Sequence, residues 1–161
     1  MIRPAQKGDA LQLAELMTQL GYPTSAEDMA GRMQTISRDE TFATFVAAEG
    51  NDVLGMIGVS DCPSYEHNDR NGRIIALVVR ADMRRRGLGR ELIRFAEDYF
   101  AQKRVGRIVL TSRFTREDAH KFYESLGYVR TGLRFMKETA LVRRRRPAPS
   151  DNPEPNQPDS L

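Results

Sequence analysis

The stretch Leu77-Val78-Val79-Arg80-Ala81-Asp82-Met83-Arg84-Arg85-Arg86-Gly87-Leu88-Gly89-Arg90 decides the fold. It begins within residues 74–79, an apolar run without alternation that is typical of a central strand covered on both faces. It ends in an amphipathic helix that we expect over residues 88–103. Apolar side chains recur at helical spacing there, at Leu88, Leu92, Phe95, Ala96 and Tyr99. A buried strand thus passes through an arginine-rich turn with two glycines directly into a helix.

This turn predicts a phosphate site. The first N–H groups of a helix have no partner within it and carry partial positive charge. Gly87 and Gly89 lack Cβ atoms, so a phosphate can approach their amides closely. Charge-assisted hydrogen bonds contribute roughly 1.5–3 kcal/mol each, so several together would fix a pyrophosphate. The alternative is an ordinary helix start with solvated arginines. The order of strand, basic turn, Gly-x-Gly and amphipathic helix favours the phosphate site.

The rest of the chain predicts a mixed α+β fold. We expect helices over residues 9–20 and 24–36, opened by the capping pairs Asp9 with Gln12 and Thr24 with Glu27. A further helix should begin near Thr115 and end at Gly127. Besides residues 74–79, the expected strands are 42–48, 53–59, 107–112, 128–130 and 133–137. The order βααβββαβαββ predicts a central mixed, mostly antiparallel sheet flanked by about four helices.

Length and composition predict one domain and a tail. The chain has 161 residues and a formal net charge of +3. We expect the domain over residues 1–141 and a disordered tail, Arg-rich and then Pro-rich, over residues 142–161. We expect no membrane-spanning segment and no secretory signal. The single cysteine, Cys62, excludes an intrachain disulfide, and together these features predict a cytoplasmic protein.

The turn resembles the acetyl-CoA-binding motif of the GNAT superfamily of N-acetyltransferases, Arg/Gln-x-x-Gly-x-Gly/Ala after a strand. Arg84, Gly87 and Gly89 occupy its defining positions, and the resemblance extends over residues 1–137. It implies acetyl-CoA as cosubstrate and a strand that splays from its neighbour, with Val78 and Val79 contacting the pantetheine arm. The implied pyrophosphate ligands are the amides of Arg84, Arg85, Arg86, Gly87, Leu88, Gly89 and Arg90.

A second signature lies in the stretch Ala119-His120-Lys121-Phe122-Tyr123-Glu124-Ser125-Leu126-Gly127-Tyr128. By the resemblance, Tyr123 gives a proton to the departing coenzyme A thiolate after direct attack by an amine in a ternary complex. The alternative is that Tyr123 only packs against the sheet, as Phe122 does. An acyl intermediate on Cys62 is disfavoured, because no histidine–acid pair accompanies it.

No carboxylate stands in residues 73–76, where family members often carry a glutamate base. Glu66 and His67, in the loop before this strand, are the candidates for contacting the acceptor and acting on it through water. Asp69 is a third candidate for the base. The alternative is that they are ordinary polar loop residues. The two histidines lie far apart in the sequence and offer no metal-ligand spacing, so we expect no metal site.

Residues 54–137 are similar to aminoalkylphosphonate N-acetyltransferases, and aminoglycoside acetyltransferases share much of the framework. The resemblance places the acceptor pocket among residues 22–33 and 61–71. Arg113 and Arg116 would bind an anionic group of the substrate. The alternatives are that they face solvent or the ribose phosphate of the cofactor. The favoured function is acetylation of a primary amine on a small molecule. Alternatives are a protein or peptide N-acetyltransferase, a non-catalytic acyl-CoA sensor, and a nucleic-acid-binding module built on residues 143–146. No base-stacking aromatic motif supports this last reading. By analogy with such folds, the chain pairs as a homodimer.

Overall fold

A computed structural model of the chain describes residues 1–140. The chain falls into two units, Met1–Val129 and the residues from Arg130 onward, and every helix and strand named below belongs to the first. The expected domain end at residue 141 and the tail over residues 142–161 lie outside the described residues.

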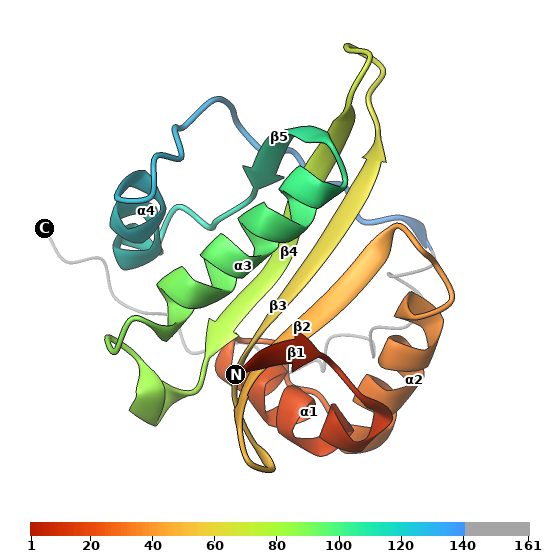
Figure 1. The fold of residues 1–161 in the computed structure, drawn as a ribbon, viewed down its shortest axis with the longest axis vertical. Helices are drawn as coiled ribbons and strands as arrows, with labels where there is room; N and C mark the ends of the chain where they lie inside the picture. Colours follow the sequence, from red (N-terminus) through yellow and green to blue (C-terminus); the bar gives the residue numbers. More distant parts are fainter. Residues whose placement is uncertain (141–161) are drawn as a thin grey trace, which may run out of the picture. The chain divides into compact units, whose positions relative to one another are not determined.

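The first unit is a five-stranded sheet with four α-helices (Figure 1). The sheet has the order β1-β2-β3-β4-β5; its first three pairings are antiparallel, and β4 pairs with β5 in parallel. This confirms the predicted mixed, mostly antiparallel sheet. The strands are β1 (Ile2–Pro4), β2 (Phe42–Glu49), β3 (Asp52–Pro63), β4 (Arg70–Val79) and β5 (Val105–Leu110). The helices are α1 (Ala10–Gln19), α2 (Ala26–Ile36), α3 (Leu88–Gln102) and α4 (Glu117–Glu124), with the 3-10 turns η1 (Lys7–Asp9) and η2 (Ala81–Met83).

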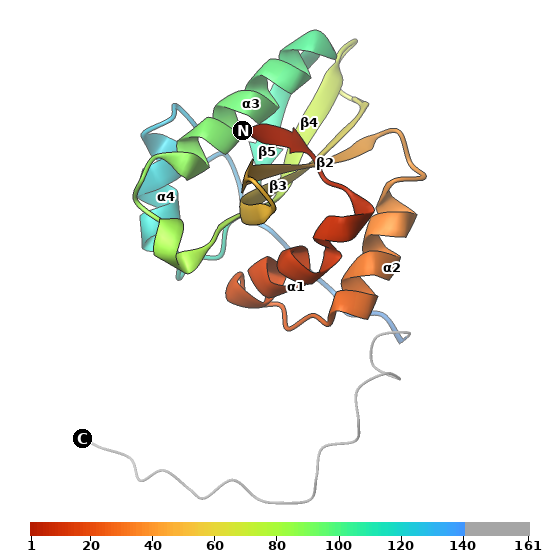
Figure 2. The same ribbon diagram turned by 60° about the horizontal axis from the view of Figure 1, so that its bottom comes forward.

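The helices cover the sheet from both sides, as Figure 2 shows for α3 on one face and α1 and α2 on the other. On the first face, α3 buries Leu92, Ile93, Ala96 and Phe100 against the sheet. On the second face, α1 and α2 bury Leu13, Leu16 and Met29. Within the apolar run of β4, Ile74 packs on the α3 face and Val78 on the α1 face, whereas Ile75 is 54% exposed, so the expected cover on both faces is only partial.

Three expectations about local structure were wrong. Ser25, not Thr24, caps α2, and its Oγ accepts a hydrogen bond from the amide of Asp28 at 3.0 Å. Residues 128–130 and 133–137 form no strands. Tyr128 is instead drawn into the core, and its hydroxyl donates to Glu97 Oε1 at 3.1 Å. The residue pattern alone did not suffice to form strands over residues 128–130 and 133–137, because a strand also needs a partner backbone.

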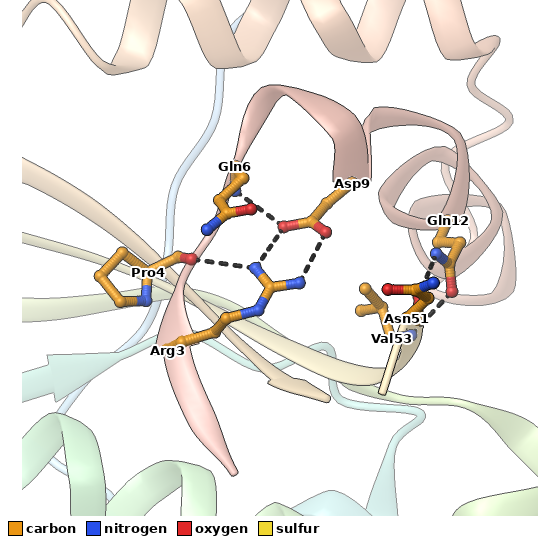
Figure 3. Close-up of polar contacts among 7 residues, drawn as sticks. All are labelled: Arg3, Pro4, Gln6, Asp9, Gln12, Asn51 and Val53. Atoms are coloured by element: carbon orange, nitrogen blue, oxygen red, sulfur yellow. Dashed lines mark hydrogen bonds and ion pairs between the residues drawn. The ribbon is translucent and has the colours of Figure 1, made fainter. Parts of the chain in front are cut away.

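The third misreading concerns Asp9 and Gln12, which do not cap α1 as a pair (Figure 3). Asp9 accepts two hydrogen bonds from the Arg3 guanidinium, at 2.7 and 2.9 Å, and a third from the amide of Gln6 at 2.7 Å. Gln12 reaches the β2–β3 turn, donating to Asn51 O at 3.0 Å and accepting from the Val53 amide at 2.7 Å. These contacts fasten η1 to β1, and α1 to the turn between β2 and β3. The hydrogen bond from Arg3 is the main cause that lowers the pKa of Asp9.

Replacing Asp9 with asparagine should therefore destabilise the fold by about 1–3 kcal/mol at pH 7, since the variant loses a largely buried, bidentate charged pair. Because the folded-state pKa is lowered, this contribution is complete above the unfolded aspartate pKa of about 4. It disappears as the pH falls through the folded-state value. Urea unfolding of both proteins at pH 7 and at about pH 2.5 measures the difference. An equal gap between the two proteins at both pH values would contradict the assignment.

Candidate active site

β4 carries a bulge at the point where its pairing with β5 ends, and its carboxyl-terminal residues 76–79, which do not pair with β5, are called the splayed end below. On β3, Gly58 and Val59 are consecutive, yet they pair with Ala76 and Ile74, so Ile75 is the extra residue on β4. The bulge changes the side-chain parity, because Ile74 packs on the α3 face together with Leu77 and Val79. Pairing of β4 with β5 ends at Ile74 opposite Leu110. Within residues 1–140, no strand pairs with residues 76–79 on the β5 side.

This splay leaves backbone groups of β4 available at an open edge. The amide of Arg80 donates to Leu54 O of β3 at 2.8 Å. Since peptide groups alternate along a strand, those of Leu77 and Val79 face the open side. The Val79 carbonyl accepts a hydrogen bond from Arg84 Nε at 3.1 Å. The remaining groups of the edge can pair with an extended ligand that carries amides of its own.

The turn after β4 presents a row of unbonded amides. Gly87 is the N-cap of α3, with φ of +88°, and no side chain caps this helix. The first backbone bond runs from the Arg90 amide to Gly87 O at 2.9 Å. In the part of the chain that the structure describes, the amides of residues 85–89 have no acceptor. Arg84, Arg85 and Arg86 are exposed beside them. The amides and the positive helix end together favour an anion.

Gly89 contributes to the packing of α3 and also to the row of unbonded amides. A Cβ atom there would lie 3.5 Å from the ring of Phe122 and 3.7 Å from Val79 Cγ2. The missing side chain therefore faces the junction of α3 with α4 and β4, not the open side of the turn. Its small size brings α3 close to β4, while its amide remains in the unbonded row.

Tyr123 lies in the last turn of α4, among aromatic rings. Its ring packs edge-on to Phe122 and Tyr128, with centroids at 5.3 and 5.9 Å. Burial raises the pKa of Tyr123, and the nearby positive charge of Arg116 opposes that shift. No residue within 1–140 forms a hydrogen bond with the Tyr123 hydroxyl, whereas the Tyr128 hydroxyl is engaged by Glu97. Tyr123 is thus a protonated phenol at neutral pH, and its proton has no partner among the residues described.

The end of α1 bridges the strands where they diverge. The amide of Ala81, just after β4, donates to Gln19 Oε1 at 2.9 Å. Arg116, in the loop from β5 to α4, donates from Nη2 to Leu20 O at 2.7 Å. The segments that follow β4 and β5 are thus both tied to the end of α1. No sequence pattern indicated that Gln19 would bind the backbone after β4.

Glu66 and His67 lie at the opposite end of β4 from Val79. They belong to the tip of the β3–β4 hairpin, where both of their amides donate to Ser64 Oγ, at 3.1 and 3.2 Å. The 10 residues of β4 separate this tip from the splayed end by roughly 30 Å (Figure 1). The structure therefore brings Val78, Val79 and the turn into α3 together, and it does not bring Glu66 and His67 to them.

The model of the acetyltransferase (GNAT) family matches residues 10–128. The chain belongs to the GNAT family. Its relatives include the uncharacterized N-acetyltransferase YhdJ of Bacillus subtilis, 27% identical over 126 residues, which are 78% of this chain and 85% of that protein. An aminoalkylphosphonate N-acetyltransferase of Salmonella typhimurium is 33% identical over 92 residues, 57% of this chain and 60% of that protein.

Among solved structures, a GNAT family acetyltransferase of Staphylococcus aureus superposes with a TM-score of 0.76 at 25% identity. The match covers 86% of this chain and 98% of that one. The chain is thus an acyl-CoA-dependent N-acetyltransferase. None of the helices described is long and apolar enough to cross a bilayer. Within residues 1–140, no cluster of three or more His, Cys, Asp or Glu side chains could hold a metal ion.

Proposed function

We propose that this GNAT enzyme transfers an acetyl group from acetyl-CoA to a primary amine of a small molecule. One observation carries the proposal: the splayed, open end of β4 leads directly into the unbonded amides of residues 85–89. The open edge suits the amide-bearing pantetheine arm, and the amides suit the pyrophosphate. The relative that acts on aminoalkylphosphonates supports a small-molecule acceptor.

In the proposed reaction, the neutral amine attacks the thioester carbonyl carbon directly. The C–N bond forms, the C–S bond breaks, and the amine loses one proton to solvent. Tyr123 donates its proton to the departing thiolate and afterwards recovers one from water. The proton transfer is uphill, since an ordinary phenol has a pKa near 10 and a cysteine thiol about 8.5, and burial raises the pKa of Tyr123 further. The positive charge of Arg116 opposes that rise and so eases the step. No nucleophilic side chain is required, which agrees with Cys62 being exposed on β3 and far from the turn in sequence.

We also propose that the enzyme works in the cytoplasm, where a reducing environment keeps a lone thiol such as Cys62 unpaired. By analogy with such folds, we also propose that two copies of the chain form a homodimer.

The proposed function is tested by following thiol release from acetyl-CoA with a panel of small amines, an amine-terminated peptide and a lysine-bearing peptide. Small-amine turnover above the rate of acetyl-CoA hydrolysis is the expected result. Turnover of the peptides alone would assign the chain to protein acetylation. Tight acetyl-CoA binding with no turnover of any amine would favour the non-catalytic sensor.

A further inference from the structure

The loop from β5 to α4 presents an arginine that is held in place without using its hydrogen-bond donors. The guanidinium carbon of Arg113 lies 5.6 Å from the centroid of the Tyr22 ring, which belongs to the turn after α1. The side chain is exposed, and among the 140 residues described it has no hydrogen bond or ion pair. Stacking orients a guanidinium while leaving its planar fork available to a bidentate anion.

The backbone beneath Arg113 is fixed at several points. Its carbonyl accepts a hydrogen bond from the Arg116 amide at 3.0 Å and pairs with His120 Nε2 at 2.9 Å. Arg116 in turn ties the loop to the end of α1 through Leu20 O. The loop is therefore anchored to both α1 and α4, and the orientation of Arg113 is set before any ligand arrives.

The same loop borders the proposed reaction site. Arg116 is close enough to Tyr123 for its charge to act on the phenol, and only two residues separate it from Arg113. No ion pair within residues 1–140 neutralises either arginine. The β5–α4 loop thus offers two positive charges close to Tyr123. Of these, Arg113 has all of its donors available, whereas Arg116 already uses one.

We propose that Arg113 is a specificity-determining residue that binds an anionic group of the acceptor. The substrate class is then a primary amine that also carries a carboxylate, phosphonate or phosphate group. This inference rests on the proposed function, because it assumes that the acceptor lies beside the β5–α4 loop and the end of α1. The anion on Arg113 orients the acceptor, and the amine at its other end faces the thioester.

The test compares four amines of similar size at saturating acetyl-CoA. They are 2-aminoethylphosphonate, β-alanine, ethanolamine and putrescine, which differ in carrying a phosphonate, a carboxylate, a neutral hydroxyl or a second ammonium group. The wild-type kcat/KM should be about 10- to 100-fold higher for the preferred anionic amine than for ethanolamine, as a bidentate charged pair implies. A phosphonate or a carboxylate preference identifies the anion.

Arg113→Gln should raise the KM of the anionic amine by a similar factor, leaving kcat, the KM of acetyl-CoA and the turnover of ethanolamine within about two-fold of wild type. Arg38→Gln is the matched control: Arg38 is an exposed arginine just after α2, at the opposite end of that helix from Tyr22, and its loss should change nothing. Equal turnover of all four amines, or an Arg113→Gln enzyme with unchanged selectivity, would overturn the inference and leave the proposed function standing.

If no amine is acetylated, the proposed function fails. The inference about Arg113 is then tested by measuring how tightly the anionic amines bind. Calorimetric titration of 2-aminoethylphosphonate and β-alanine into the enzyme saturated with coenzyme A should then give a Kd at least about 10-fold weaker in Arg113→Gln than in wild type. Absence of binding, or binding that the substitution does not alter, would overturn the inference.

Discussion

Replacing Tyr123 with phenylalanine should lower kcat by roughly 100- to 10,000-fold, the usual contribution of a positioned general acid. The KM of acetyl-CoA should stay within about two-fold, because the hydroxyl has no hydrogen bond with residues 1–140 to lose and the ring keeps its contacts with Phe122 and Tyr128. Steady-state kinetics of thiol release measures both quantities.

The matched control is Tyr99→Phe, which removes a hydroxyl from a ring packed against Phe45 in the same core. We expect kcat of this variant within about two-fold of wild type. If both tyrosine variants lose activity equally, the effect is structural. If Tyr123→Phe keeps more than about half of the wild-type kcat, solvent protonates the thiolate and the assigned role is wrong.

The pH dependence follows from the same group. Burial raises the pKa of Tyr123 above the ordinary phenol value of about 10. The donor is active while protonated, so its ionisation should depress wild-type kcat only above about pH 10. The phenylalanine variant should lack this alkaline decline.

Replacing Gly87 with valine should weaken acetyl-CoA binding by about 10- to 100-fold or more. The φ of +88° at Gly87 is strained for a β-branched residue, although open space surrounds the position where a Cβ atom would lie. Relief of this strain would turn the amides of residues 85–89 away from their common direction. The loss of one or two charge-assisted hydrogen bonds then accounts for the weaker binding. Calorimetric titration with acetyl-CoA measures the change in Kd.

Two substitutions control this experiment. Asparagine tolerates the left-handed region, so Gly87→Asn should recover much of the affinity. Gly89→Ala adds a methyl group at ordinary contact distance from Phe122 and Val79, and the Kd should stay within about three-fold. Equal losses at Gly89→Ala and Gly87→Val would show that the helix position, not the conformation of the turn, decides binding.

The sequence predicted the parts of the fold that depend on local pattern. The apolar run of β4, the glycine-bearing turn and the period of α3 lie within about 30 consecutive residues, and each is a local signal. The choice between Thr24 and Ser25 as the cap of α2 was not settled by a local signal, since both residue types are favoured N-caps and stand side by side.

Features that depend on pairing between strands could not be derived from the residue pattern, although the family resemblance implied a bulge in β4. The bulge at Ile75 arises from the register of β4 on β3, and no residue of β4 by itself indicates that register. The strand was expected to begin at residue 74, but the hairpin extends to Arg70 and is reinforced there by the ion pair of Arg70 with Asp61 at 3.0 Å. This extra length carries Glu66 and His67 away from the splayed end, although they precede it closely in the sequence.

Thermal unfolding with and without excess acetyl-CoA tests the central claim, that the splayed end of β4 and the amides of residues 85–89 bind this cosubstrate. A ligand at 100 times its Kd stabilises the folded state by about 2.7 kcal/mol, which raises the Tm of a domain of this size by roughly 5–10 °C. We predict a shift of this size in wild type, about half of it or less in Gly87→Val, and retained in Gly89→Ala. No shift of wild type at millimolar acetyl-CoA would contradict the account.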